Sequence, residues 1–155
     1  NANLGGADLS YADLNEADLT KANLYNATLS RADLDHADLT NARLVYADLT
    51  NANLMNAVLT NADLYNAVLT NADLRYADLT NARLVYADLT NVNLSGADLT
   101  NADLRQSLID SANLNDADIK FADFSDATIA RTTFTNSYWH QTTWTDGVRY
   151  DSNQA

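Results

Sequence analysis

Cysteine is absent from this chain of 155 residues, and basic residues are few. Without cysteine the chain has no disulfide framework, no thiolate metal site and no cysteine nucleophile. Nine lysines and arginines stand against 21 aspartates and glutamates, so the formal net charge is −12. Direct binding to nucleic acid or to an anionic membrane requires a basic surface, which makes both unexpected here. No apolar run approaches the roughly 18 residues of a membrane span, and no signal-peptide pattern is present.

Catalytic signatures are also missing. The sequence contains no HExxH, G-x-S-x-G or P-loop pattern, and its four glycines form no phosphate-binding loop. The two histidines, His36 and His140, lie far apart in the chain. We therefore expect no enzymatic activity, no cofactor and no metal site.

A repeat of five residues organises most of the chain. Leucine occupies every fifth position from Leu4 to Leu104, which is 21 positions, and alanine stands two residues before each, with Val92 as the exception. The residue between them is usually Asp or Asn, so the unit is A-(D/N)-L-x-x. A five-residue step would spread the leucines over every face of an α-helix and would break the alternation of a β-strand.

Each unit can instead form a short extended segment followed by a corner. In extended backbone the alanine and leucine point to one side and the middle residue, Asp or Asn, points to the other. The last two residues then turn the chain. Asparagine at the second of them, as in Asn41 and Asn61, suits a corner because asparagine tolerates positive φ. The pattern predicts a polygonal coil with leucine and alanine inside.

Units such as "ADLTN" and "ANLYN" resemble those of the pentapeptide repeat family, described by A(D/N)LXX, and the likeness is closest to its cyanobacterial members. The resemblance implies an all-β fold, a right-handed quadrilateral parallel β-helix with four units per coil and about seven coils, stabilised by stacking of neighbouring coils. Residues 1–131 are expected to form the regular β-helix. Residues 132–155 are expected to form a degenerate last coil, a C-terminal cap and a tail.

On such a coil, residues twenty apart in the sequence stack in columns on the surface. One column alternates in charge and consists of Arg43, Asp63, Arg83 and Asp103. Exposed ion pairs contribute little stability. We therefore expect this charged column to fix the register between coils.

Two neighbouring columns carry the most apolar outer surface. The stretch "NARLVYADLT" occurs at 41–50 and again at 81–90, two coils later, so its Val-Tyr pair returns on the same face. This candidate interaction surface, called the tyrosine face below, consists of Tyr25, Val45, Tyr46, Tyr65, Val85 and Tyr86. Two interpretations remain open, which are packing between coils and a patch for a partner or a second copy of the chain.

Most acidic residues occupy the slot between alanine and the inward leucine. In one interpretation they are a solvated surface that supports the turns. In the other, the charged rod imitates duplex DNA, as family members that protect DNA gyrase from quinolones are thought to do. Arg43 and Arg83 weaken the mimicry on one face, and the uniform leucines and absent loop insertions set this chain apart from those members.

After residue 106 the repeat loosens and larger inward residues replace leucine, among them Phe134, Trp139 and Trp144. A solenoid must block its open end, because an unpaired edge recruits another chain. We predict that these three residues form a C-terminal cap. A dimer interface at the same end is the alternative, and the two are compatible.

These features predict a non-catalytic scaffold that binds a protein, with a DNA mimic acting on a topoisomerase as the alternative. The sequence does not specify the partner, and a homodimer would form through the C-terminal end or the tyrosine face. Localisation stays open between the cytoplasm and, if a signal peptide precedes Asn1, the periplasm or thylakoid lumen.

Overall fold

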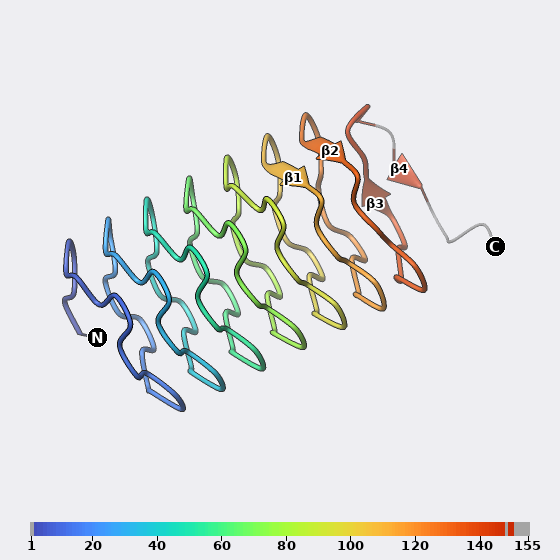
Figure 1. Ribbon diagram of the computed structural model, residues 1–155. Helices are drawn as coiled ribbons and strands as arrows, with labels where there is room; N and C mark the ends of the chain where they lie inside the picture. The colour runs from blue at the N-terminus through green and yellow to red at the C-terminus, as the bar shows by residue number, and fades with distance from the viewer. Residues whose placement is uncertain (1, 148, 151–155) are drawn as a thin grey trace.

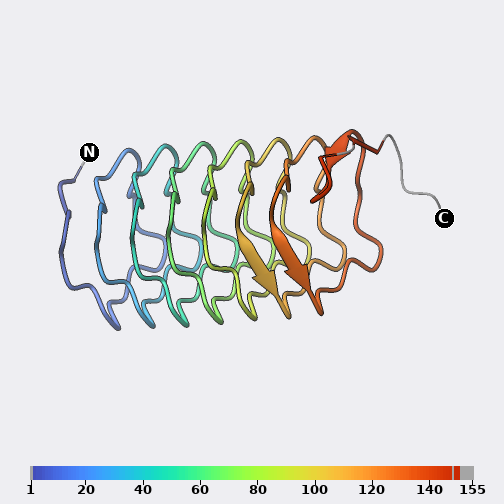
Figure 2. The ribbon, with the colours of Figure 1, turned by 90° about the horizontal axis from the view of Figure 1, so that it is seen from above.

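The computed structural model describes residues 2–147 and 149–150, which form a rod of stacked coils (Figure 1). From above, successive coils follow one another along the rod in sequence order (Figure 2). Parallel bridges join residues twenty apart, from Asn3↔Asn23 to Asp123↔Thr143, and the bridges recur every five residues along most of the chain. Each coil therefore has four sides, as the resemblance to the pentapeptide repeat family implies.

Backbone hydrogen bonds explain why one five-residue unit can form one side of a coil. The leucine and middle-residue N–H groups bond to neighbouring coils, as in Leu4 N to Asn23 O and Asn23 N to Ala2 O, both 2.8 Å. At most corners the next alanine N–H bonds back to the leucine carbonyl, as in Ala7 N to Leu4 O at 3.0 Å. The second corner residue has positive φ, which confirms the expectation for asparagine. The same conformation is imposed on other residue types, since φ at Tyr46 is 60°.

Aspartate and asparagine in the middle slot complete the corners. Their side-chain oxygen accepts the N–H of the first corner residue, as in Ser10 N to Asp8 Oδ1 at 3.0 Å and Thr80 N to Asp78 Oδ1 at 2.8 Å. This bond is an Asx turn, and it explains why the middle slot favours a short side chain with an oxygen, although residues such as Val58 also fit there. The aspartates that accept it are Asp8, Asp13, Asp18, Asp33, Asp38, Asp48, Asp63, Asp73, Asp78, Asp88, Asp98, Asp103, Asp118 and Asp123, and the asparagines are Asn3, Asn23, Asn53, Asn93 and Asn113.

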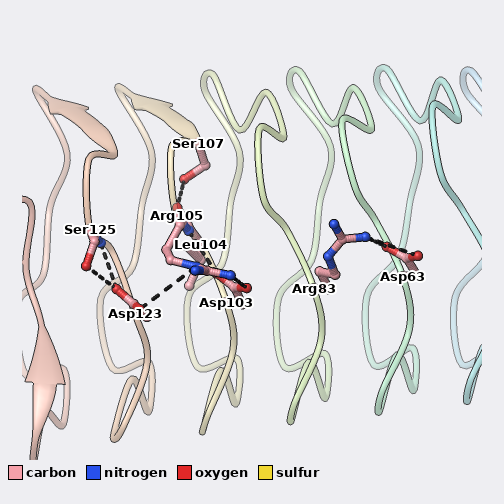
Figure 3. Close-up of polar contacts among 8 residues, drawn as sticks. All are labelled: Asp63, Arg83, Asp103, Leu104, Arg105, Ser107, Asp123 and Ser125. Atoms are coloured by element: carbon pink, nitrogen blue, oxygen red, sulfur yellow. Dashed lines mark hydrogen bonds and ion pairs between the residues drawn. The ribbon is translucent and has the colours of Figure 1, made fainter.

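Leucine and alanine fill the interior of the rod as one continuous core. Where a hydroxyl replaces an inward alanine, a backbone carbonyl accepts its hydrogen bond. Ser107 Oγ donates to Leu104 O at 2.6 Å (Figure 3), and Thr142 Oγ1 donates to Ile119 O at 2.7 Å. The buried hydroxyls are therefore satisfied, which removes the cost of burying them.

Longer strand pairing occurs only near the C-terminal end of the described residues. Strand β1 (Leu108–Asp110) pairs in parallel with β2 (Thr128–Ala130), and β3 (Thr142–Thr143) pairs antiparallel with β4 (Arg149–Tyr150). Because β4 runs antiparallel to β3, it adds a strand to the last coil that does not continue the solenoid. Within residues 2–147 and 149–150 no helix is long and apolar enough to span a membrane.

Candidate interaction surface

The tyrosine face is a ladder of aromatic contacts along one corner of the rod. The ring centroids of Tyr25 and Tyr46 lie 5.8 Å apart, those of Tyr46 and Tyr65 6.0 Å, and those of Tyr65 and Tyr86 5.5 Å. All three pairs are edge-to-face, with interplanar angles from 81° to 88°. This geometry is favourable for aromatic pairs, so four successive coils are linked by one zigzag of rings.

The valines and the tyrosines of this face differ in exposure. Val45 and Val85 are buried, whereas Tyr46 and Tyr86 remain 45% and 47% exposed. The valines therefore contribute to packing between coils. The tyrosine rings pack against each other and still present apolar surface to solvent, so both interpretations of the face are compatible with the geometry.

The charged column stacks in register but does not form a continuous series of ion pairs. The backbone bridges Arg43↔Asp63, Asp63↔Arg83 and Arg83↔Asp103 are present. Arg83 Nη1 lies 3.1 Å from Asp63 Oδ1 (Figure 3). Arg43 makes no ion pair with the described residues, and Asp103 pairs with Arg105 of its own unit. A role of the column in fixing register stays a prediction.

Both arginines of the charged column lie over tyrosine rings of the tyrosine face. The guanidinium carbon of Arg43 is 4.5 Å from the centroid of Tyr25, and that of Arg83 is 4.4 Å from the centroid of Tyr65. These are cation–π distances. The charged column and the tyrosine face thus form one connected surface.

Arg105 is a member of this surface that the sequence analysis did not single out. Its guanidinium lies between two carboxylates, with Nη2 at 2.7 Å from Asp103 Oδ2 and Nε at 4.0 Å from Asp123 Oδ2 (Figure 3). The hydrogen bond to Asp103 raises the pKa of Arg105 above its ordinary value. Its position in the sequence could have identified it, because Arg105 lies twenty residues after Val85 and so continues the same column.

A cavity of about 280 Å³ lies where the tyrosine face ends. It combines aromatic, aliphatic and charged side chains and is lined by Tyr65, Arg83, Val85, Tyr86, Arg105, Gln106 and Asp126. The two arginines are already paired with carboxylates, whereas the exposed Asp126 side chain has no hydrogen bond or ion pair within the described residues. The cavity therefore places aromatic rings and two paired arginines beside one carboxylate.

The predicted cap residues gather around Trp144. Its ring stacks on Phe124 at 5.2 Å and meets Phe134 at 5.3 Å and Trp139 at 5.0 Å, both edge-to-face. Phe134, Trp139 and Trp144 are partly buried and pack against the leucine core. The arrangement fits a cap that covers the end of the core. The cap and the alternative dimer interface both stay predictions.

The described part of the chain offers little for chemistry. No group of three or more His, Asp or Glu residues within it is arranged to hold a metal ion. His36 lies near Asp35, with 3.9 Å between Nε2 and Oδ1, and the His140 ring meets Phe121 edge-to-face at 5.5 Å. The two histidines lie in different coils and form no common site.

Four-sided coils with inward leucine at every fifth residue define a class of β-solenoid. The family model for pentapeptide repeats matches residues 1–35, 32–71, 62–101, 72–110 and 97–136, with 8 copies. The chain belongs to the pentapeptide repeat family, and its fold is the right-handed quadrilateral β-helix that the family resemblance implies.

Similar solved structures include pentapeptide repeat proteins. HetL, involved in heterocyst differentiation regulation in the cyanobacterium Nostoc sp. strain PCC 7120, is 31% identical, with 97% of this chain and 88% of HetL covered and a TM-score of 0.35. A protein of the Arabidopsis thaliana thylakoid lumen is 32% identical over 67% of this chain and 69% of its own, with a TM-score of 0.50. QnrB1, a plasmid-mediated fluoroquinolone resistance protein, is 18% identical over 88% and 69%, with a TM-score of 0.48. No curated protein matches the chain.

Proposed function

We propose that this chain is a non-catalytic scaffold that binds a protein partner through the tyrosine face. The observation that supports the proposal is the ladder of four tyrosines, two of them about half exposed, joined to Arg43 and Arg83. Tyrosine and arginine are enriched among the residues that dominate binding energy at protein interfaces. Two of the other three corners, those that hold Thr40 and Thr50, carry mainly Thr and Asn, which contribute less to such interfaces.

The ladder is also ordered before any partner arrives. Each ring contacts at least one ring of a neighbouring coil, and the backbone below is bonded from coil to coil, as in Tyr46 N to Tyr65 O at 3.0 Å. Immobilising a free side chain at an interface costs about 0.5–1.5 kcal/mol. A preformed ladder avoids part of that cost.

The alternative is a DNA mimic that binds a topoisomerase. The net charge of −12 on a rod favours it. However, each middle-slot aspartate accepts an N–H at its own corner, as Asp78 and Asp98 do. The fold therefore accounts for the position of these side chains, a role that asparagine fills at Asn53 and Asn93. Arg43, Arg83 and Arg105 further interrupt the acidic surface. We therefore favour the scaffold.

The test of the scaffold compares recovery of a binding partner by three forms of the chain. The native chain, the double variant Tyr46→Ser/Tyr86→Ser and the control Tyr76→Ser are immobilised and exposed to lysate of the source organism. Tyr76 is a matched control because it is 65% exposed and lies half a coil away. A partner retained by the native and control chains but lost by the double variant, with far-UV circular dichroism unchanged, supports the proposal. Equal recovery by the double variant contradicts it.

A supercoiling assay tests the alternative separately. A DNA mimic inhibits gyrase or protects it from a quinolone at micromolar protein concentration. No inhibition and no protection would eliminate the mimic.

A further inference from the structure

We propose that the tyrosine face binds a polyproline II segment that carries a basic residue. This inference rests on the proposed function and specifies the chemistry of the partner segment. It follows from the spacing of the face, the state of its backbone groups and its distribution of charge.

The spacing of the tyrosine face matches the repeat of a polyproline II helix. Tyr46 and Tyr86 lie two coils apart, as do Tyr25 and Tyr65. At about 4.8 Å between paired strands, two coils span roughly 9.6 Å along the rod. A polyproline II helix has three residues per turn with a rise of about 3.1 Å, so one side of it repeats every ~9.3 Å. A segment lying along the rod would thus place every third side chain at an equivalent position.

Other backbone conformations fit this spacing less well. Side chains on one side of a β-strand recur about every 6.6 Å. On an α-helix, residues seven apart recur at about 10.5 Å. Over two such intervals along the rod (~19.2 Å), the repeat of a polyproline II helix differs from the coil spacing by about 0.6 Å. The repeat of an α-helix differs from it by about 1.8 Å.

Backbone N–H and C=O groups along this corner already form hydrogen bonds between neighbouring coils. Tyr46 N donates to Tyr65 O at 3.0 Å, and Tyr86 N donates to Arg105 O at 3.1 Å. The corner is therefore not a free sheet edge, and a partner cannot bind to it by adding a β-strand. A polyproline II segment needs no such pairing, because it docks through side chains on aromatic grooves.

The end of the face can accommodate a cation, because Arg83 and Arg105, which line the same cavity as Asp126, are already paired with other carboxylates. Arg43 and Arg83 already lie over Tyr25 and Tyr65, which shows that these rings accept a guanidinium group. Within the described residues no cation lies over Tyr46 or Tyr86. The carboxylate of Asp126 lines the adjacent cavity without an ion pair of its own. An arginine or lysine of the segment would pair with Asp126 while neighbouring prolines pack on the exposed rings.

Fluorescence anisotropy with three labelled peptides tests the proposal. The first peptide contains three Pro-x-x turns with arginine at one end, the second has glutamate in place of the arginine, and the third has alanine in place of every proline. We expect the native chain to bind the first peptide at least about tenfold more tightly than either of the others, a difference of ~1.4 kcal/mol. The double variant Tyr46→Ser/Tyr86→Ser should lose about tenfold in affinity for the first peptide. Tyr76→Ser should lose none.

Asp126→Asn separates the contribution of charge from that of the prolines. It should weaken binding of the arginine peptide by about threefold or more and leave the glutamate peptide unweakened. Equal binding of the proline and alanine peptides would overturn the proposal, because charge alone would then be sufficient.

The remaining outcomes distinguish this inference from the proposed function. If no peptide binds but a partner is still recovered through Tyr46 and Tyr86, the polyproline inference fails and the scaffold stands. If neither is seen, both fail. If light scattering shows a dimer that the double variant loses, and no peptide binds, the occupant is a second copy of the chain and the inference is overturned.

Discussion

Gly96 and Gly6 offer a matched test of how side chains pack over the corners. Both occupy the second corner slot, with φ of +69° and +68°. A Cβ atom on Gly96 would lie 2.6 Å from both Cδ1 and Cε1 of Tyr76, whereas a Cβ on Gly6 would have no atom within 4 Å. Gly6→Ala therefore adds only backbone strain, and Gly96→Ala must also displace the Tyr76 ring.

The two costs can be estimated from the structure. The left-handed conformation costs an alanine about 1–2 kcal/mol. Tyr76 is 65% exposed, so displacing it into solvent forfeits the burial of about a third of a ~200 Å² side chain, roughly 1.5–2 kcal/mol as an upper bound. Gly96→Ala should then lower the free energy of unfolding by about 2–4 kcal/mol and Gly6→Ala by ~1–2 kcal/mol.

A double-mutant cycle measures the displacement directly. Unfolding in guanidinium chloride is followed by far-UV circular dichroism for Gly96→Ala, Tyr76→Ser and the combined variant. The combined variant should show a coupling of about 1–2 kcal/mol, because serine leaves no ring to displace. A coupling below ~0.3 kcal/mol, within the error of additivity, would refute the contact between Tyr76 and the corner of the next coil.

Two further predictions concern acid stability and the C-terminal end. Hydrogen bonds from Ser10 and Thr20 lower the pKa of Asp8 and Asp18, so their stabilisation is present above the unfolded pKa of about 4 and is lost as pH falls below it. Asp8→Asn/Asp18→Asn should keep the corner bonds yet show a smaller fall in melting temperature between pH 7 and pH 3, and an identical fall would contradict this cause. Trp144→Ala should lower stability by about 3 kcal/mol or more and promote self-association of a monomeric chain in light scattering, whereas loss of a native dimer would indicate an interface.

The five-residue period predicts a polygonal coil for a physical reason, and the family resemblance supplies the number of units per coil. Leucine at every fifth position has a common inward direction only if each unit contains one extended segment and one corner. The bridges Arg43↔Asp63 and Val58↔Asp78 confirm that residues twenty apart stack. The corner role of the aspartates was one of two open interpretations, and bonds such as Ser10 N to Asp8 Oδ1 support it. Positive φ at Tyr46 was not expected, because tyrosine alone does not favour that conformation.

The sequence by itself determined which residues lie inside. With four units per coil, as the family resemblance implies, it also determined which residues share a column, because hydrogen bonds between coils place every unit in the same register. Only the tertiary structure decided which neighbours the long side chains contact. Arg43 lies over Tyr25, and Arg83 lies near Asp63 and over Tyr65. Arg105 lies between the carboxylates of Asp103 and Asp123. Such side chains have several rotamers of similar energy, so their direction depends on the groups that the adjacent coils place within reach. The cavity beside Tyr86 follows from those directions and could not be derived from the repeat.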